Sequence, residues 1–185
     1  MTTRVSQKQA RLLELIRQRA YRKGEFTLAS GKKSDTYIDG KMVQFHPVAA
    51  YLLGECLYEL LENEHFDAIG GLAVGAVPLI ESFVISCYHH QRAVEGFFVR
   101  ERQKGHGTEK KIEGLFRSGC KAVLVDDVVT AGGSVLKAVE AAEEAGAEIV
   151  MVVAVVDREE GGGDRIREKY RFEALFTKRD LAGEA

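Results

Sequence analysis

Residues 148–158, EIVMVVAVVDR, form a nearly continuous apolar run that is rich in β-branched side chains. Such a run predicts a strand covered on both faces, because a strand with one wet face would alternate apolar and polar residues. Strands of this kind occur in parallel sheets that lie between layers of helices. This one segment therefore points to an α/β fold.

The rest of the chain alternates between helix and strand patterns. Helices are expected at 6–20, at 47–63 beginning with Pro47, after Pro78, and at the end of 121–145. Strands are expected in the segments 67–79, 94–100 and 121–145, as a short antiparallel pair within 24–41, and at an edge near the C-terminus. The alternation predicts a central, mostly parallel sheet flanked by helices, with right-handed crossovers.

Composition narrows the class of protein. The 185 residues suit one domain, 45% of them are hydrophobic, and the formal net charge is -2. This charge provides no basic field for nucleic acid, and no apolar run is long enough to cross a membrane. The three cysteines have neither disulfide nor metal-ligand spacing, and no secretory signal opens the chain. A cytoplasmic protein is expected, with no nucleic-acid or membrane partner.

Four unusual loops, at 73–78, 100–112, 126–134 and 157–163, follow predicted strands. Ligands of open α/β sheets bind beyond the carboxyl ends of the strands, so these loops are expected to form one site. Each loop, considered alone, could also be an ordinary structural feature with no role in binding. The 73–78 loop could be a tight turn, 100–112 a solvated loop, and Arg158 a surface arginine.

The loop at 126–134 indicates what that site holds. Asp126 and Asp127 end an apolar strand, and a glycine-containing turn then leads into a helix near Ser134. Carboxylates accept hydrogen bonds from sugar hydroxyls or bind a divalent cation, whereas a helix N-terminus and bare backbone suit a phosphate. Thr130 and Ser134 add hydroxyl donors. The pattern predicts a site for a ribose 5-phosphate.

The stretch VLVDDVVTAGGS resembles the phosphoribosyl pyrophosphate (PRPP) signature of type I phosphoribosyltransferases. Other segments look like successive motifs of the orotate phosphoribosyltransferase family, in the same order and over roughly residues 24–163. These segments are GEFTLASGKKSDTYID, GGLAVGAVPL, FFVRERQKGHGTEKKIEG and VVDREEGG.

The resemblance implies a single domain, with an N-terminal helix and hood in 1–45 and a PRPP-binding core in 46–185. It implies transfer of ribose 5-phosphate from PRPP to orotate, which gives orotidine 5'-monophosphate and pyrophosphate in pyrimidine biosynthesis. The expected cofactor is Mg²⁺, held mainly by PRPP and water rather than by protein side chains. The expected assembly is a homodimer in which the 100–112 loop reaches the neighbouring site.

The resemblance also implies roles for individual residues. The residues expected to bind PRPP are Arg100, Lys104, His106, Asp126, Asp127, Val128, Val129, Thr130, Ala131, Gly132, Gly133 and Ser134. Orotate is expected to contact Thr130 and Arg158, and a guanidinium fork indeed matches a planar carboxylate. Lys104, His106 and Asp127 are the expected catalytic residues.

Two positions depart from the family pattern. Glu101 follows Arg100, where many members have a lysine, and Ala29 precedes the Ser-Gly pair, where some members have a lysine. The roles of those lysines are not transferred to other residues. Two alternatives stay open: a purine or other phosphoribosyltransferase with the same signature, and a PRPP-sensing regulator that binds nucleic acid.

Overall fold

The computed structural model describes residues 6–27, 33–101 and 111–183. Its centre is a six-stranded sheet in the order β5-β4-β3-β6-β7-β8. All neighbouring strands are parallel except β5, which runs antiparallel to β4. The mostly parallel sheet is therefore confirmed. The strands are β3 (Ala68–Gly70), β4 (Glu95–Val99), β5 (Ile112–Gly114), β6 (Lys121–Val129), β7 (Glu148–Asp157) and β8 (Phe172–Thr177).

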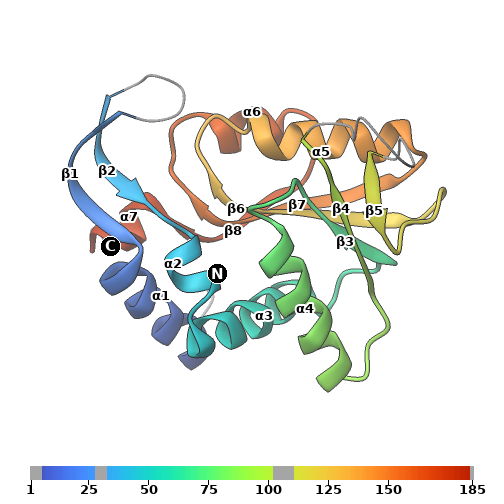
Figure 1. Cartoon of the computed structure of the whole chain (residues 1–185), viewed down its shortest axis with the longest axis horizontal. Helices are drawn as coiled ribbons and strands as arrows, with labels where there is room; N and C mark the ends of the chain where they lie inside the picture. The colour runs from blue at the N-terminus through green and yellow to red at the C-terminus, as the bar shows by residue number, and fades with distance from the viewer. Residues whose placement is uncertain (1–5, 28–32, 102–110, 184–185) are drawn as a thin grey trace.

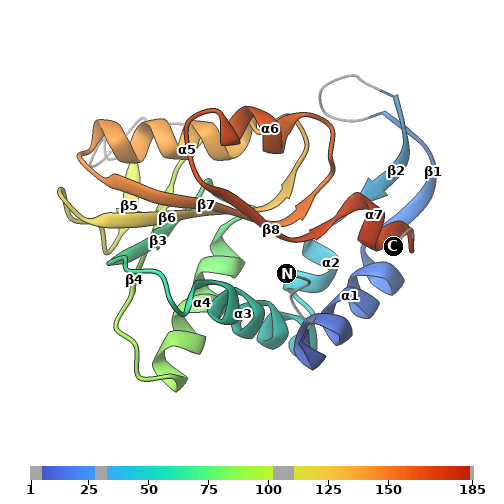
Figure 2. The same ribbon diagram turned by 180° about the vertical axis from the view of Figure 1, so that it is seen from behind.

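Helices cover both faces of this sheet (Figures 1 and 2). One face carries α1 (Gln7–Arg19), α3 (Pro47–Leu61) and α4 (Val77–His89), and the other carries α5 (Gly133–Glu144) and α6 (Gly162–Arg167). Alternate residues of the central strands supply the two cores, because successive side chains of a strand point to opposite faces. Val123 and Val125 belong to the first core, whereas Leu124 belongs to the second.

Local signals account for where the helices begin. Ser6 caps α1 by accepting a hydrogen bond from the Gln9 amide at 3.1 Å. Pro47 and Pro78 lie in the first turns of α3 and α4, where a missing N–H leaves no helical hydrogen bond unmade. The expected helices at 6–20 and 47–63 are thus confirmed with small shifts of their ends.

A two-stranded antiparallel ribbon extends from one end of the molecule (Figure 1). It consists of β1 (Tyr21–Thr27) and β2 (Lys33–Ile38), and we call it the hood. The antiparallel pair is confirmed, whereas the Ser-Gly turn expected between its strands lies outside the described residues. The division at residues 45 and 46 stays a prediction.

Three short elements were not expected from the sequence: α2 (Lys41–Gln44), the strand β5, and α7 (Lys178–Ala182). Among the described residues, no helix has the length and apolar character needed to span a membrane.

The strand order identifies the crevice of the sheet. From β3 the chain proceeds outward to β4 and β5, whereas from β6 it proceeds in the opposite direction to β7 and β8. The connections that leave the carboxyl ends of β3 and β6 therefore run in opposite directions. Open α/β sheets bind ligands at such a switch point.

Candidate active site at the switch point

Asp126 and Asp127 lie near the carboxyl end of β6, at this switch point. The Asp127 amide donates to Asp126 Oδ1 at 3.0 Å, and the Val128 amide donates to Asp127 Oδ1 at 2.9 Å. Asp126 is only 7% exposed, whereas Asp127 is partly exposed. Of the two predicted acids, Asp127 is therefore the one more open to a ligand.

The two carboxylates influence each other electrostatically. Burial, and after it the charge of Asp127, raises the pKa of Asp126 well above its ordinary value. The pair consequently retains a proton at higher pH than two separate carboxylates would. A positively charged or hydrogen-bonding ligand that binds both acids would oppose this shift.

The turn after the acids leaves a helix end open. Gly132 adopts a left-handed conformation (φ 74°) that favours glycine, and α5 begins at the next residue. Within the described part of the chain, no side chain caps α5 and no acidic residue lies in its first turn. A Cβ on Gly133 would meet no atom within 4 Å. The backbone N–H groups of this turn are therefore suited to an anion.

The neighbouring loops meet this turn on both sides. A Cβ on Gly75, in the loop after β3, would lie 3.3 Å from Asp127 Oδ1. After the loop that follows β7, the amide of Gly162, the first residue of α6, donates to the Thr130 carbonyl at 3.0 Å. At the end of β4, the Ala73 amide donates to the Val99 carbonyl at 2.8 Å. The described parts of the four predicted loops thus converge at one edge of the sheet.

Arg158 follows β7 and is 3% exposed. Its Nη2 donates to Ser34 Oγ at 2.9 Å and to the Thr36 carbonyl at 3.2 Å, and its Nε donates to Glu160 at 3.0 Å. The guanidinium therefore joins the hood to the core. It also borders a cavity of about 530 Å³ that the hood and α7 enclose with the 158–160 segment.

The predicted basic loop is only partly described. Arg100 hydrogen-bonds to Glu113, the middle residue of β5, and its guanidinium carbon lies 6.0 Å from the centre of the Phe98 ring. Its role in binding PRPP stays a prediction. Lys104 and His106 lie outside the described residues.

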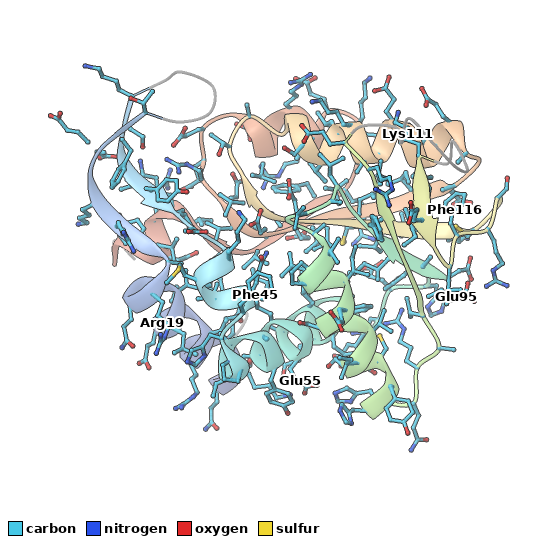
Figure 3. The ribbon with its side chains drawn as sticks, viewed as in Figure 1. Arg19, Phe45, Glu55, Glu95, Lys111 and Phe116 are labelled. Atoms are coloured by element: carbon cyan, nitrogen blue, oxygen red, sulfur yellow. The ribbon has the colours of Figure 1, made fainter. Side chains whose placement is uncertain are left out.

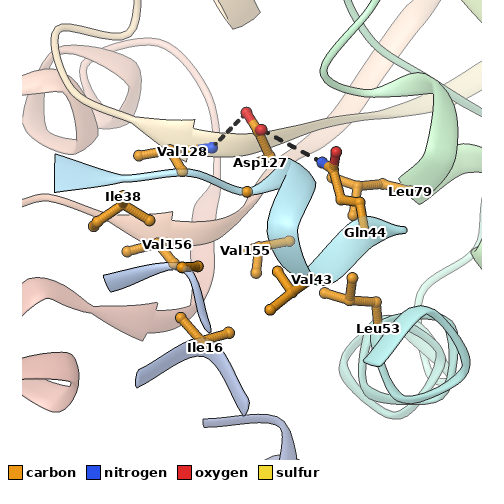
Figure 4. Close-up of a pocket in the computed structure, with 12 residues that line it drawn as sticks. Ile16, Ile38, Val43, Gln44, Leu53, Leu79, Asp127, Val128, Val155 and Val156 are labelled. Atoms are coloured by element: carbon orange, nitrogen blue, oxygen red, sulfur yellow. Dashed lines mark hydrogen bonds between the residues drawn. The ribbon is translucent and has the colours of Figure 1, made fainter. Parts of the chain in front are cut away.

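The sequence did not indicate that α2 takes part in the site. Gln44, at the end of α2, directs its side-chain nitrogen toward Asp127 Oδ2 at 3.4 Å (Figure 4). Gly40, which precedes α2, lies so close that a Cβ there would be 2.5 Å from the same oxygen. No motif marks this segment, because the family-like stretch quoted for the hood ends at Asp39.

Mg²⁺ prefers oxygen ligands, which the carboxylates of the acid pair could supply. The two Oδ1 atoms already accept backbone N–H groups. In residues 6–27, 33–101 and 111–183, no three histidine, cysteine or acidic side chains are placed to hold a metal. The described residues therefore supply no complete set of protein ligands for the ion.

Comparison with known proteins places this geometry in a family. The sequence profile of the phosphoribosyl transferase domain matches residues 40–175. The orotate phosphoribosyltransferase of Bradyrhizobium sp. strain BTAi1 is 45% identical over 181 residues, which are 95% of this chain and 98% of that protein.

Solved structures agree with the sequence comparison. A phosphoribosyltransferase from Corynebacterium diphtheriae superposes with a TM-score of 0.83 and 36% identity, over 96% of this chain and 99% of that chain. Mycobacterium tuberculosis orotate phosphoribosyltransferase in complex with PRPP gives 0.79 and 31%, over 95% and 99%. The chain therefore belongs to the orotate phosphoribosyltransferase family of pentosyltransferases.

Proposed function

We propose that this chain transfers ribose 5-phosphate from PRPP to orotate, in a Mg²⁺-dependent reaction that yields orotidine 5'-monophosphate and pyrophosphate. The observation that carries the proposal is the acid pair beside an uncapped helix end, at the same sheet edge as a buried arginine. Acids suit ribose hydroxyls, the helix end suits the 5-phosphate, and the arginine suits the carboxylate of orotate.

Each part has a defined role in the proposed reaction. Asp126 and Asp127 accept hydrogen bonds from the ribose hydroxyls, while the 128–134 backbone with Thr130 and Ser134 binds the 5-phosphate. When bound, Mg²⁺ lowers the negative charge of the pyrophosphate. As the bond to pyrophosphate breaks, positive charge develops at the anomeric carbon, and the nearby carboxylates stabilise it electrostatically. The orotate ring nitrogen attacks the opposite face and releases its proton to water, so no protein nucleophile is required.

Arg158 and Thr130 are proposed to bind orotate. The hydrogen bonds of Arg158 in this structure use Nε and Nη2. This leaves Nη1 for the orotate carboxylate, in the pocket that the hood borders.

Lys104 and His106, with Arg100, are proposed to contact the pyrophosphate in the transition state. If so, Lys104→Ala should lower kcat by roughly 100-fold, the loss typical of one preorganised charge-stabilising group. Lys121→Ala is the control, since Lys121 begins β6 at the opposite end of the strand from the acid pair, and its side chain lies 3.9 Å from Glu148. Normal turnover of the Lys104 variant would contradict the role.

We further propose that the enzyme is a cytoplasmic homodimer whose 100–112 loop reaches the partner's site. Three free, buried cysteines support a reducing compartment. Exposed apolar side chains on the outer side of α3 and α4 support a second copy as partner; we call them the α3–α4 surface, and they are Val48, Tyr51, Ile85 and Tyr88.

A steady-state assay tests the proposed activity. With Mg²⁺ and PRPP present, orotate absorbance should fall, and Asp127→Asn should slow this loss by at least about 10-fold because one acceptor becomes neutral. Asp164→Asn, whose side chain is 88% exposed on α6, should behave like the wild type. An enzyme that is active with adenine or guanine but not with orotate would contradict the proposal.

A further inference from the structure

Gln44 connects the two loops that diverge at the switch point. It is the last residue of α2 and is 4% exposed. Its Nε2 donates to the Gly75 carbonyl at 2.9 Å and lies 3.4 Å from Asp127 Oδ2 (Figure 4). One amide thus contacts both the loop after β3 and the acid pair after β6.

The surroundings of Asp127 leave its carboxylate little freedom. Oδ1 accepts the Val128 amide at 2.9 Å, and a Cβ on Gly75 would lie 3.3 Å from this oxygen. On the other side, Gly40 lies against Oδ2. A Cβ on Gly40 would be 2.5 Å from this oxygen, so no side chain fits there. The orientation of the carboxylate is therefore set by α2 and the Gly75 loop together.

Packing alone does not account for an amide at position 44. Gln44 Oε1 is buried and has no hydrogen-bond partner among the described residues, which is unfavourable for a polar atom. The side chain borders a small cavity of about 10 Å³, whose other lining is mainly apolar, including Val43, Leu53 and Leu79 (Figure 4). A leucine or methionine would fill the same space without an unpaired oxygen.

We propose that Gln44 is a positioning residue: its side-chain N–H group holds Asp127 in register with the Gly75 loop, so that the two loops bind PRPP as one preformed surface. The amide is neutral, and a third carboxylate beside Asp126 and Asp127 would repel them. Preorganisation of this kind lowers the cost of ordering the site when a ligand binds.

Since this role depends on the proposed function, PRPP binding to the wild type is measured first, by calorimetry with Mg²⁺. Gln44→Leu should weaken PRPP binding about 10-fold, the effect of losing one hydrogen bond to a charged group. The KM for orotate should change less than about 2-fold, and the thermal midpoint should stay within ~3 °C of the wild type or rise. A merely structural role would instead lower the midpoint.

Val43→Ala is the matched control, because Val43 is buried in the same helix and borders the same cavity. It should lower the thermal midpoint and leave PRPP affinity within about 2-fold of the wild type. Gln44→Glu, which keeps the shape but adds a charge, should weaken PRPP binding more than Gln44→Leu does. If the leucine variant fails to fold, the glutamate variant tests the role of Gln44. Unchanged PRPP affinity in a folded Gln44 variant would overturn the role, whereas a wild type that does not bind PRPP would overturn the proposed function itself.

Discussion

Arg158 joins two parts of the protein that lie far apart in the sequence. Its guanidinium is buried and donates to Ser34 and Thr36 of the hood as well as to Glu160 beside it. Glu160 Oε1 lies 2.9 Å from Arg158 Nη2, so the buried charge is compensated before any ligand arrives. These contacts fix the orientation of the guanidinium fork under the hood.

Arg158→Lys should therefore affect orotate more than PRPP. A lysine keeps the charge, but it cannot bond to the hood and to Glu160 and still offer a fixed N–H group to the carboxylate. The KM for orotate should rise roughly 10- to 100-fold, with a much smaller change in the KM for PRPP.

Arg179→Lys is the control for this measurement, because Arg179 borders the same cavity but its side chain is 73% exposed. Equal rises in both KM values for the Arg158 variant would show that Arg158 does not select the base.

Some residues at the switch point have a chemical signature in the sequence, and others have none. Asp126 and Asp127 stood out because two charges at the end of an apolar strand require a ligand or partner. Gln44 lies in a stretch without a motif, and its contact with Asp127 depends on how α2 packs after the hood. Long-range packing of this kind leaves no local pattern.

At the scale of elements, β6, β7 and the long helices were predictable because each is long enough for its pattern to show, an apolar run in the strands and helical spacing in the helices. The strand β5 (Ile112–Gly114) was not, because it is defined only by its pairing with Phe97–Val99. The helix α7 did carry a signal: Thr177 and Asp180 form a capping box. This short helix was therefore predictable from the sequence.

The α3–α4 surface carries a prediction at the same scale. Tyr88 is 80% exposed and Ile85 is 52% exposed, one helical turn apart on α4. If a second copy covers them, Tyr88→Glu should convert the dimer into a monomer in sedimentation velocity, because a charge would be buried in an apolar contact.

Glu81→Gln, an exposed change on the same helix, should leave the dimer intact. A monomeric wild type would contradict the homodimer, and a dimeric Tyr88 variant would exclude this surface as the interface.

For the whole molecule, one buried carboxylate links three helices. Glu55 lies on α3 (Figure 3) and is 4% exposed. It contacts Lys8 of α1 at 2.6 Å, Ser86 of α4, and His90 at 3.2 Å. Burial raises the pKa of Glu55, but the hydrogen bonds from Lys8, Ser86 and His90 outweigh it and lower the pKa to about 2.

The sign of the pH dependence follows from this lowered pKa. The ionised carboxylate stabilises the fold fully above the ordinary pKa of 4.5, and this contribution is lost as the pH falls toward 2. Glu55→Gln should therefore reduce the free energy of unfolding at pH 7 by about 3 kcal/mol and flatten its decline between these pH values.

Urea unfolding at several pH values measures this effect. Glu59→Gln is the control. Glu59 also contacts Lys8, at 3.1 Å, but its side chain is 36% exposed, so the free energy of unfolding should change by less than about 1 kcal/mol. A Glu55 variant as stable as the wild type at pH 7 would contradict the proposed link between the three helices.

We propose above that this site joins the ribose of PRPP to orotate. The most direct measurement offers the enzyme PRPP, Mg²⁺ and an equimolar mixture of orotate, adenine, guanine and hypoxanthine, and identifies the nucleotides formed by mass spectrometry. We predict that orotidine 5'-monophosphate is the only nucleotide formed. A purine nucleotide in place of orotidine 5'-monophosphate would contradict the claim.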